Sequence, residues 1–344
     1  EHLVTAEYGQ IIELFEGVKI RFVDAGHLLG SASVEMWMEE GGVEKKIVFS
    51  GDIGNVNQPI IRDPSWVHGA DYVVMESTYG DRNHAPVASY TAELAKIIDD
   101  TFSKGGNVII PSFAVGRTQE LLYFMREMKK EGLVKSNPDF TVCVDSPLAN
   151  EATKIFSGDL RGYLDEEALE VVKEGERLFT FPGLMMTESS EESKLLNLDK
   201  SSKVIISASA IPGNEKAISK IINELYRKGA EVIYEKSEGL HVSGHACQEE
   251  LKIVHALTRP KFFIPVHGEQ RHLQLHSKLA QSMGMSPRNI HIGELGTVFE
   301  FTGKSCKEAP PVTAGKVFVD GTGVGDVGSV VLRDRKHLAQ DGML

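Results

Sequence analysis

The sequence has few cysteines and no long apolar run. Among its 344 residues are 3 cysteines, Cys143, Cys247 and Cys306, which are widely spaced and form no C-x-x-C pair. An odd, scattered set of this kind argues against a disulfide framework or a zinc finger, and it favours a reducing, cytoplasmic setting. No stretch approaches the roughly 18 apolar residues of a membrane span, and no secretory signal pattern is present. We therefore expect a cytoplasmic protein without a membrane segment.

Positive charge is also scarce, because 37 Lys and Arg residues stand against 49 Asp and Glu residues, a net charge of −12. This balance excludes nucleic-acid binding by overall charge alone, but it leaves open a local basic groove or a carboxylate-lined cation site. Residues 259–288 form such a basic segment, in which Glu269 is the only acidic residue. The 41% hydrophobic and 25% charged fractions are those of a folded globular protein.

The apolar pattern changes along the chain. Short alternating strands dominate residues 18–76, and Gly41-Gly42 indicates a hairpin between two of them. Helical and buried-strand patterns then alternate to about residue 234, which predicts an α/β protein with a parallel sheet. The length predicts two domains and part of a third. Residues 303–315, with two adjacent prolines, are predicted to be a linker.

Three glycine-flanked polar segments follow predicted strands, namely GHLLGS at 26–31, SGD at 50–52 and VHGE at 266–269. Imidazole and carboxylate groups are ligands that Zn²⁺ accepts, and a carboxylate can bridge two ions. Taken singly, His27 and His267 also fit structural histidines, and Asp52 fits a turn former. The histidines at 255, 272, 276 and 291 lack a ligand-like neighbour, and we interpret them as surface or packing residues.

Two further segments, ESTYG at 76–80 and HVSGH at 241–245, complete an ordered set of five motifs. The set resembles the metallo-β-lactamase-fold nucleases of the β-CASP branch, and more narrowly the ribonuclease J family. Residues 18–209 look closest to β-CASP proteins of the cleavage-and-polyadenylation-factor type, whereas the chain from Ile211 onward looks like ribonuclease J. Mixed lineage and assembly from two sources are both open explanations of this change.

The resemblance implies a zinc site and a catalytic pair. His27, Asp52 and His267 would be metal ligands, with Asp52 bridging two Zn²⁺ ions. His245, oriented by Glu76, would be the general acid that protonates the leaving oxygen, and Asp52 would share in catalysis.

The resemblance also implies contacts with the RNA phosphate. His241, Ser243, Gly244 and His245 would hold the phosphate. Arg117 stands where a helix is predicted to begin, a position that favours anions, so it is a further candidate. An ordinary surface arginine is the alternative interpretation of Arg117.

The implied architecture is an α/β metallo-β-lactamase αββα sandwich interrupted by an inserted β-CASP α/β domain. The first domain would comprise residues 1–85, N-terminally truncated, and return at 239–303. The β-CASP domain would comprise 86–238, and 304–344 would be a linker and the start of a ribonuclease J-like C-terminal region. The implied activity is hydrolysis of RNA, endonucleolytic or from the 5′ end, by a homodimer or homotetramer.

One family motif, H-x-H-x-D-H, should lie upstream of His27 and does not, since His2 is the only other histidine there. We expect that an N-terminal segment has been lost, and that the 344 residues alone bind zinc poorly and are inactive. Two alternatives remain: an inactive RNA-binding relative, and a hydrolase of small esters or thioesters with the same fold. The ESTYG and HVSGH motifs and the long insertion argue against the second.

Overall fold

The computed structural model describes residues 3–83, 90–187, 200–206, 214–234, 244–303 and 305–315, with a few single positions and one short strand pair beyond. The chain divides into two compact units, Glu1–His291 and Ile292–Leu344. Among the described residues, no helix has the length and apolarity to cross a membrane. His241 and Ser243 lie outside the described residues.

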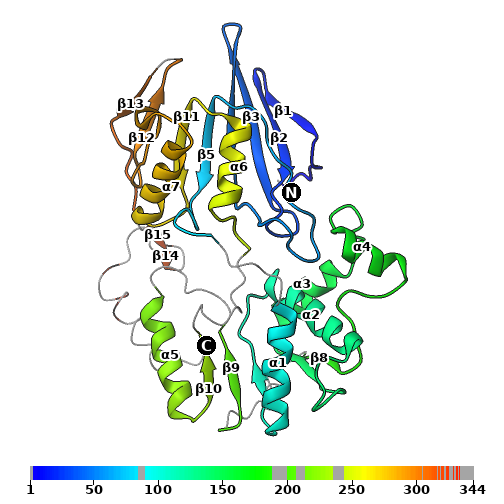
Figure 1. Ribbon diagram of the computed structural model, residues 1–344. Helices are drawn as coiled ribbons and strands as arrows, with labels where there is room; N and C mark the ends of the chain where they lie inside the picture. The colour runs from blue at the N-terminus through cyan, green and yellow to red at the C-terminus, as the bar shows by residue number, and fades with distance from the viewer. Residues whose placement is uncertain are drawn as a thin grey trace. The chain divides into compact units, whose positions relative to one another are not determined.

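A six-stranded sheet forms one part of the first unit (Figure 1). The strands stand in the order β1 (Ile11–Phe15), β2 (Val18–Asp24), β3 (Ala32–Glu40), β4 (Val43–Phe49), β5 (Tyr72–Glu76) and β11 (Phe262–Val266). The first four strands pair antiparallel with one another, and the predicted hairpin at Gly41-Gly42 joins β3 to β4. β4, β5 and β11 are parallel, with Val266 opposite Glu76, so their carboxyl ends meet at one edge.

Helices α6 (Gln248–Thr258) and α7 (Gln270–Ser282) pack together beside this sheet. Strands β5 and β11 are apolar on both faces, and alternate residues of each strand face the same side of the sheet. The core includes Val73 and Met75 of β5, Phe263 of β11, Leu251 of α6 and Leu279 of α7. This packing holds the ends of β5 and β11 in a fixed relation to the start of each helix.

Alternating helices and strands form the other part of the first unit, which confirms the α/β pattern predicted from the sequence. A parallel sheet has the order β10 (Glu231–Ile233), β9 (Lys203–Ile205) and β6 (Val108–Ile109), and β7 (Val142–Val144) pairs with β8 (Leu184–Met186). The helices are α1 (Tyr90–Ser103), α2 (Arg117–Glu131), α3 (Pro147–Phe156), α4 (Glu166–Lys173) and α5 (Glu215–Arg227). α3 and α4 begin at Ser146 and Asp165, whose side chains accept hydrogen bonds from backbone N–H groups of the first turn.

Backbone hydrogen bonds and close packing join these parts of the first unit. The segment after β4 pairs with the chain before α4, because Arg62 N donates to Tyr163 O over 3.0 Å and Asp165 N donates to Ile60 O over 3.0 Å. Gly116, at the start of α2, lies so close to Leu28 that an added Cβ would stand 2.4 Å from its Cδ2. The loop that carries His27 is therefore packed against the start of α2.

The second unit contains the antiparallel pair β12 (Val298–Phe301) and β13 (Cys306–Ala309), and the short pair β14 (Val319–Asp320) and β15 (Gly323–Val324). The linker prediction for residues 303–315 was therefore wrong for 306–309. These residues pair with β12 through backbone hydrogen bonds, which the adjacent prolines at 310 and 311 end.

Candidate metal centre

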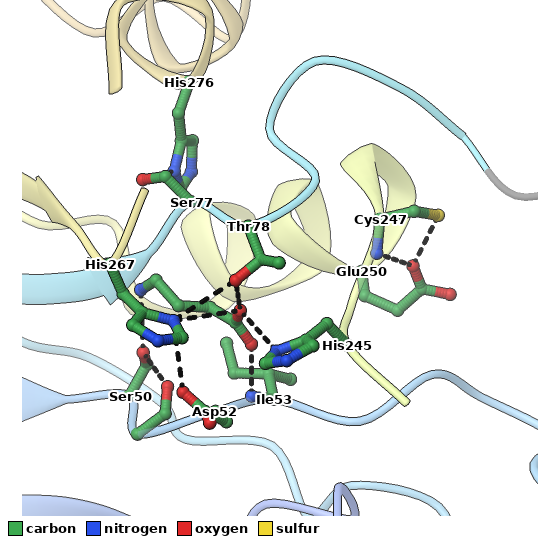
Figure 2. A network of polar contacts seen from close by, with 12 residues as sticks. Ser50, Asp52, Ile53, Ser77, Thr78, His245, Cys247, Glu250, His267 and His276 are labelled. Atoms are coloured by element: carbon green, nitrogen blue, oxygen red, sulfur yellow. Dashed lines mark hydrogen bonds and ion pairs between the residues drawn. The ribbon is translucent and has the colours of Figure 1, made fainter. Parts of the chain in front are cut away.

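Four polar side chains converge where the parallel strands end (Figure 2). Asp52 follows β4, Glu76 ends β5, His267 follows β11, and His245 lies just before α6. One ligand atom from each lies within 4.8 Å of the others. Their sequence positions are far apart, and the parallel order of β4, β5 and β11 brings three of them to one edge. We call these four residues the acid–imidazole cluster.

Glu76 is the buried member of the cluster, with 1% of its surface exposed. Its Oε1 accepts a hydrogen bond from the backbone N–H of Ile53 over 2.5 Å, and its Oε2 accepts one from Thr78 Oγ1 over 2.7 Å. Oε2 also lies 2.9 Å from His245 Nδ1. Burial alone would raise the pKa of Glu76, but hydrogen bonds from His245, His267 and Thr78 outweigh it and lower the pKa to about 2. Glu76 is therefore an ionised carboxylate at neutral pH.

His267 and Asp52 form the accessible side of the cluster, with 56% and 42% of their side-chain surfaces exposed. His267 Nδ1 lies 3.4 Å from Asp52 Oδ1 and 4.0 Å from Glu76 Oε2. The nearby Glu76 carboxylate raises the pKa of His267, burial opposes this rise, and the charge of Asp52 adds to it. The backbone of His267 has a φ of +54°, a left-handed conformation that costs a non-glycine residue roughly 1–2 kcal/mol. Strain of this kind tends to be kept where a side chain must point in a required direction.

The backbone turn at Gly51 sets the direction of the Asp52 side chain. Gly51 has a φ of +58°, and an added Cβ would stand 2.5 Å from the carbonyl oxygen of Ala32. Only glycine fits a turn that is both left-handed and in contact with backbone. The sequence prediction of a sharp turn at SGD is met by this geometry.

His27 lies beside the cluster rather than within the four-residue group. Its ring centroid is 4.3 Å from that of His245, with the planes 37° apart. Its backbone N–H donates to Ser31 Oγ over 3.0 Å, which fixes the loop. Gly244 lies against the imidazole, because an added Cβ would stand 2.9 Å from His27 Cε1. Burial lowers the pKa of His27, and His245 lowers it further, so the ring is held neutral and able to bind a metal ion.

The structure thus brings together most of the residues predicted from the sequence. Asp52, His267, Glu76 and His245 form one group, and His27 and Gly244 border it. Two carboxylates and two imidazoles within 4.8 Å are a donor set that Zn²⁺ accepts, so the residues present could hold a metal ion.

Two contributors were missed by sequence reasoning. Thr78 donates to Glu76 and lies 3.2 Å from His267 Nδ1, although it stands in the ESTYG segment. The N–H of Ile53 also holds Glu76. The hydroxyl side chain of Thr78 could have indicated a hydrogen-bond donor to Glu76. A backbone N–H group such as that of Ile53 cannot be recognised from the sequence.

Arg117 has a different environment from the one predicted. Its side chain is only 9% exposed, and its guanidinium lies 2.5 Å from both Glu120 Oε2 and the hydroxyl of Tyr90. The guanidinium carbon also stands 4.9 Å from the centroid of the Tyr90 ring. These contacts fasten α2 to α1, so the guanidinium is engaged within the protein.

Comparisons with known proteins give matches to two domain models and to ribonuclease J proteins. A Beta-Casp domain model matches residues 118–211, and a Zn-dependent metallo-hydrolase RNA specificity domain model matches residues 229–292. Ribonuclease J2 of Bacillus subtilis (strain 168) is 34% identical over 265 residues, which are 74% of this chain and 47% of that protein. Ribonuclease J of Thermus thermophilus is 46% identical over 141 residues, which are 41% of this chain and 25% of that protein.

A crystal structure of a protein of unknown function from Enterococcus faecalis V583 superposes with a TM-score of 0.47 at 11% identity, over 90% of this chain and 68% of that chain. The chain spans about half the length of the Bacillus subtilis relative and about a quarter of the Thermus thermophilus relative. The predicted fold class, a metallo-β-lactamase fold with an inserted β-CASP domain, is confirmed by the matched domains and the mixed α/β structure. The two matched domain models and the ribonuclease J relatives together support a β-CASP, ribonuclease J-like protein.

Proposed function

We propose that this protein is a zinc-dependent ribonuclease that hydrolyses the phosphodiester bonds of RNA, endonucleolytically or from the 5′ end. The observation that carries the proposal is the convergence of Asp52, Glu76, His245 and His267 within 4.8 Å in a ribonuclease J-like chain. Hydrolysis of a phosphodiester needs charge stabilisation at phosphorus and a proton for the leaving oxygen. The cluster contains groups suited to both tasks.

In this proposal His27, Asp52 and His267 would hold two zinc ions. When bound, zinc acts as a Lewis acid toward the scissile phosphate. The exposure of Asp52 and His267 supports the assignment, because their ligand atoms face the side that a substrate can reach. The ionised state of Glu76 adds negative charge behind them, which favours a cation.

His245 is the proposed general acid. Its Nδ1 faces the Glu76 carboxylate at 2.9 Å, so that carboxylate holds the Nδ1 proton and fixes the tautomer and the ring plane. Proton donation to the leaving 3′ oxygen would then proceed from Nε2. A carboxylate that orients a histidine in this way also stabilises the protonated ring.

The phosphate is proposed to be held by the segment around Gly244, together with His241 and Ser243. The close approach of Gly244 to His27 supports this, since it keeps backbone and imidazole side by side at the cluster. Arg117 is not part of the proposal, because Glu120 and Tyr90 already engage its guanidinium. The basic segment 259–288, which includes α7, supports an approach of RNA near that helix.

We also propose a cytoplasmic location and a homodimeric or homotetrameric assembly. The sequence has only 3 cysteines, which are widely spaced and form no C-x-x-C pair, and this supports a reducing compartment. The assembly is proposed by similarity to ribonuclease J, and its test is the mass measured by light scattering.

The experiment compares wild type and His245→Ala in the gene product at its natural length, with zinc and a 5′-monophosphorylated RNA oligomer. His245→Ala should lower the cleavage rate by about 10²-fold or more while the zinc content stays unchanged. Exposed His68 provides the matched control, and His68→Ala should cleave normally. Loss of zinc from His245→Ala would show that His245 is a ligand instead.

The same experiment tests the alternatives. Wild-type protein that binds RNA without cleaving it would favour a binding protein. Turnover of a small thioester with no turnover of RNA would favour the small-ester hydrolase. Either result would overturn the proposed ribonuclease activity.

A further inference from the structure

Three buried side chains form a continuous hydrogen-bonded chain behind the acid–imidazole cluster. Ser77 Oγ lies 2.9 Å from His276 Nδ1, and His276 Nε2 lies 3.2 Å from His255 Nε2. Ser77 and His276 are fully buried, and 6% of the surface of His255 is exposed. Buried polar groups persist where they are hydrogen-bonded, and this chain satisfies three of them with one another.

The chain reaches the cluster through Ser77. Its neighbours Glu76 and Thr78 direct their oxygens to the cluster, whereas Ser77 directs its hydroxyl to His276, as alternation along an extended backbone requires. Figure 2 shows Ser77 beside His276, with the Thr78 hydroxyl on the side of His267 and His245. The His276 contact therefore holds this three-residue segment from the side opposite to the cluster.

Ser77 also links the segment to the loop that carries His267. Its backbone N–H donates to the carbonyl oxygen of His267 over 3.3 Å. His267 is the residue with a φ of +54°, so its strained backbone is held partly by Ser77. A shift of Ser77 would move Glu76, Thr78 and the His267 carbonyl together.

The two histidines are themselves immobilised by packing. Phe263 of β11 packs against both, with its ring centroid 4.5 Å from that of His255 and 4.8 Å from that of His276. Gly80 leaves room for His276, since an added Cβ there would stand 2.9 Å from the Cβ of His276. The position of Ser77 is thus set by α6, α7 and β11 at once.

We propose that His276, supported by His255, is a positioning residue for the acid–imidazole cluster. It acts through Ser77 on the placement of Glu76, Thr78 and His267. The inference rests on the proposed function in one respect, namely that the cluster binds a metal ion. Residues that orient metal ligands from behind typically change metal affinity by about 10–100-fold when they are replaced.

The experiment compares five single substitutions and one double substitution in the gene product at its natural length, using Co²⁺ as the probe and its visible absorption as the readout. His276→Leu removes the hydrogen bonds of His276 to Ser77 and to His255. Ser77→Ala removes the hydroxyl group, and so only the Ser77–His276 hydrogen bond. Each should weaken Co²⁺ binding by about tenfold or more, and the double substitution should weaken it little further, because both remove the same interaction.

Rescue separates the two hydrogen bonds of His276. In His276→Asn the amide stands where Nδ1 stood and can still meet Ser77, so Co²⁺ affinity should return most of the way. In His276→Gln the amide stands nearer the position of Nε2 and can meet His255 instead, so recovery should be smaller. Equal affinity in all of these variants and wild type would overturn the inference.

A control separates positioning from stability. Leu279→Ala removes a buried side chain from the same helix without touching Ser77, and it should lower the melting temperature while Co²⁺ affinity stays within about twofold of wild type. An equal loss of Co²⁺ affinity in Leu279→Ala and His276→Leu would assign the effect to general destabilisation.

A measurement without metal keeps the inference distinct from the proposed function. Imidazole ¹⁵N spectra of the metal-free chain should show altered His245 and His267 signals in His276→Leu and Ser77→Ala, but not in Leu279→Ala. If wild type binds no Co²⁺, the metal site fails while these spectra still decide the positioning role. Unchanged His245 and His267 signals would overturn that role.

Discussion

The Nδ1 atom of His245 lies 2.9 Å from Oε2 of Glu76, across 169 positions of sequence. Glu76 is almost fully buried, and a buried carboxylate keeps its charge only when donors surround it. His245, Thr78 and the N–H of Ile53 are those donors. The pair is therefore mutually dependent: the imidazole keeps the carboxylate ionised, and the carboxylate orients the imidazole.

The Glu76→Gln substitution tests whether the negative charge of Glu76, rather than its size, is needed beside His245. The amide keeps the size of the side chain but removes the negative charge that orients and stabilises the imidazole ring of His245. We expect RNA cleavage by the natural-length gene product to fall about 10²-fold or more. The measurement is kcat and its pH profile under zinc saturation.

Glu35→Gln is the matched control for that substitution. Glu35 is also buried, but its partners Arg21 and Lys46 lie within the strands β2 and β4. The Glu35→Gln substitution should lower the free energy of unfolding and leave kcat unchanged. Equal effects of the two substitutions on kcat would contradict a specific role for Glu76.

Gly244→Ala should disturb His27 through direct contact. The new methyl group would stand 2.9 Å from His27 Cε1 and 3.1 Å from Nδ1, so the imidazole has to move. We expect weaker zinc binding by about tenfold, because a displaced ligand costs affinity on this scale. Isothermal titration with Zn²⁺ measures it, with Gly162→Ala as control, since no heavy atom lies within 4 Å of a Cβ there. Unaltered zinc affinity in Gly244→Ala would contradict the assignment of His27 as a zinc ligand.

Stability should fall as the solution is acidified below neutral pH, because two buried histidines resist protonation. Burial lowers the pKa of His255 to about 4, and burial together with His255 lowers that of His276 to about 3. The unfolded chain binds these protons near the ordinary value of about 6.5. The contribution of both residues is therefore complete above about pH 6.5, and it is lost as the pH falls toward the folded-state values.

Urea unfolding at pH 7.5 and pH 5 measures the effect, which is about 2 kcal/mol for His255 alone. His255→Phe should flatten the pH dependence by that amount, whereas substitution of exposed His68 by Gln should leave it as in wild type. An identical slope in His255→Phe and wild type would show that His255 is not buried in the neutral form.

The sequence made Asp52 and His267 candidates because each follows a predicted strand beside glycine, whereas Glu76 and His245 were implied by the family resemblance. Asp52 and His267 follow strands whose apolar pattern is clear, and both were predicted ligands. Which strands would be neighbours was not readable from periodicity, and the order β4-β5-β11 is what makes Glu76 the centre. The membership of Glu76 in the acid–imidazole cluster thus depends on topology rather than on local sequence.

The buried histidines show where pattern reasoning stopped short. His276 lies on the same face of α7 as the buried residues Leu273, Leu279 and Ala280, so the 3.6-residue period does place it inward. The sequence does not identify the hydrogen-bond partner of this inward-facing histidine, because Ser77 is 199 positions away. Packing was a correct interpretation for His276, and the hydrogen-bonded chain could be seen only once the fold brought the three groups together.

Arg117 gives the last prediction, because helix-start position and burial point to different roles for it. Its partners Tyr90 and Glu120 bind two separate arms of the guanidinium, a geometry that lysine cannot reproduce. Arg117→Lys should lower the free energy of unfolding by about 1–3 kcal/mol, the cost of leaving buried polar partners unsatisfied. RNA affinity and its dependence on salt should stay as in wild type. Exposed Arg161→Lys is the control for stability. A drop in the salt slope of RNA binding by about one in Arg117→Lys would instead restore Arg117 as a phosphate contact.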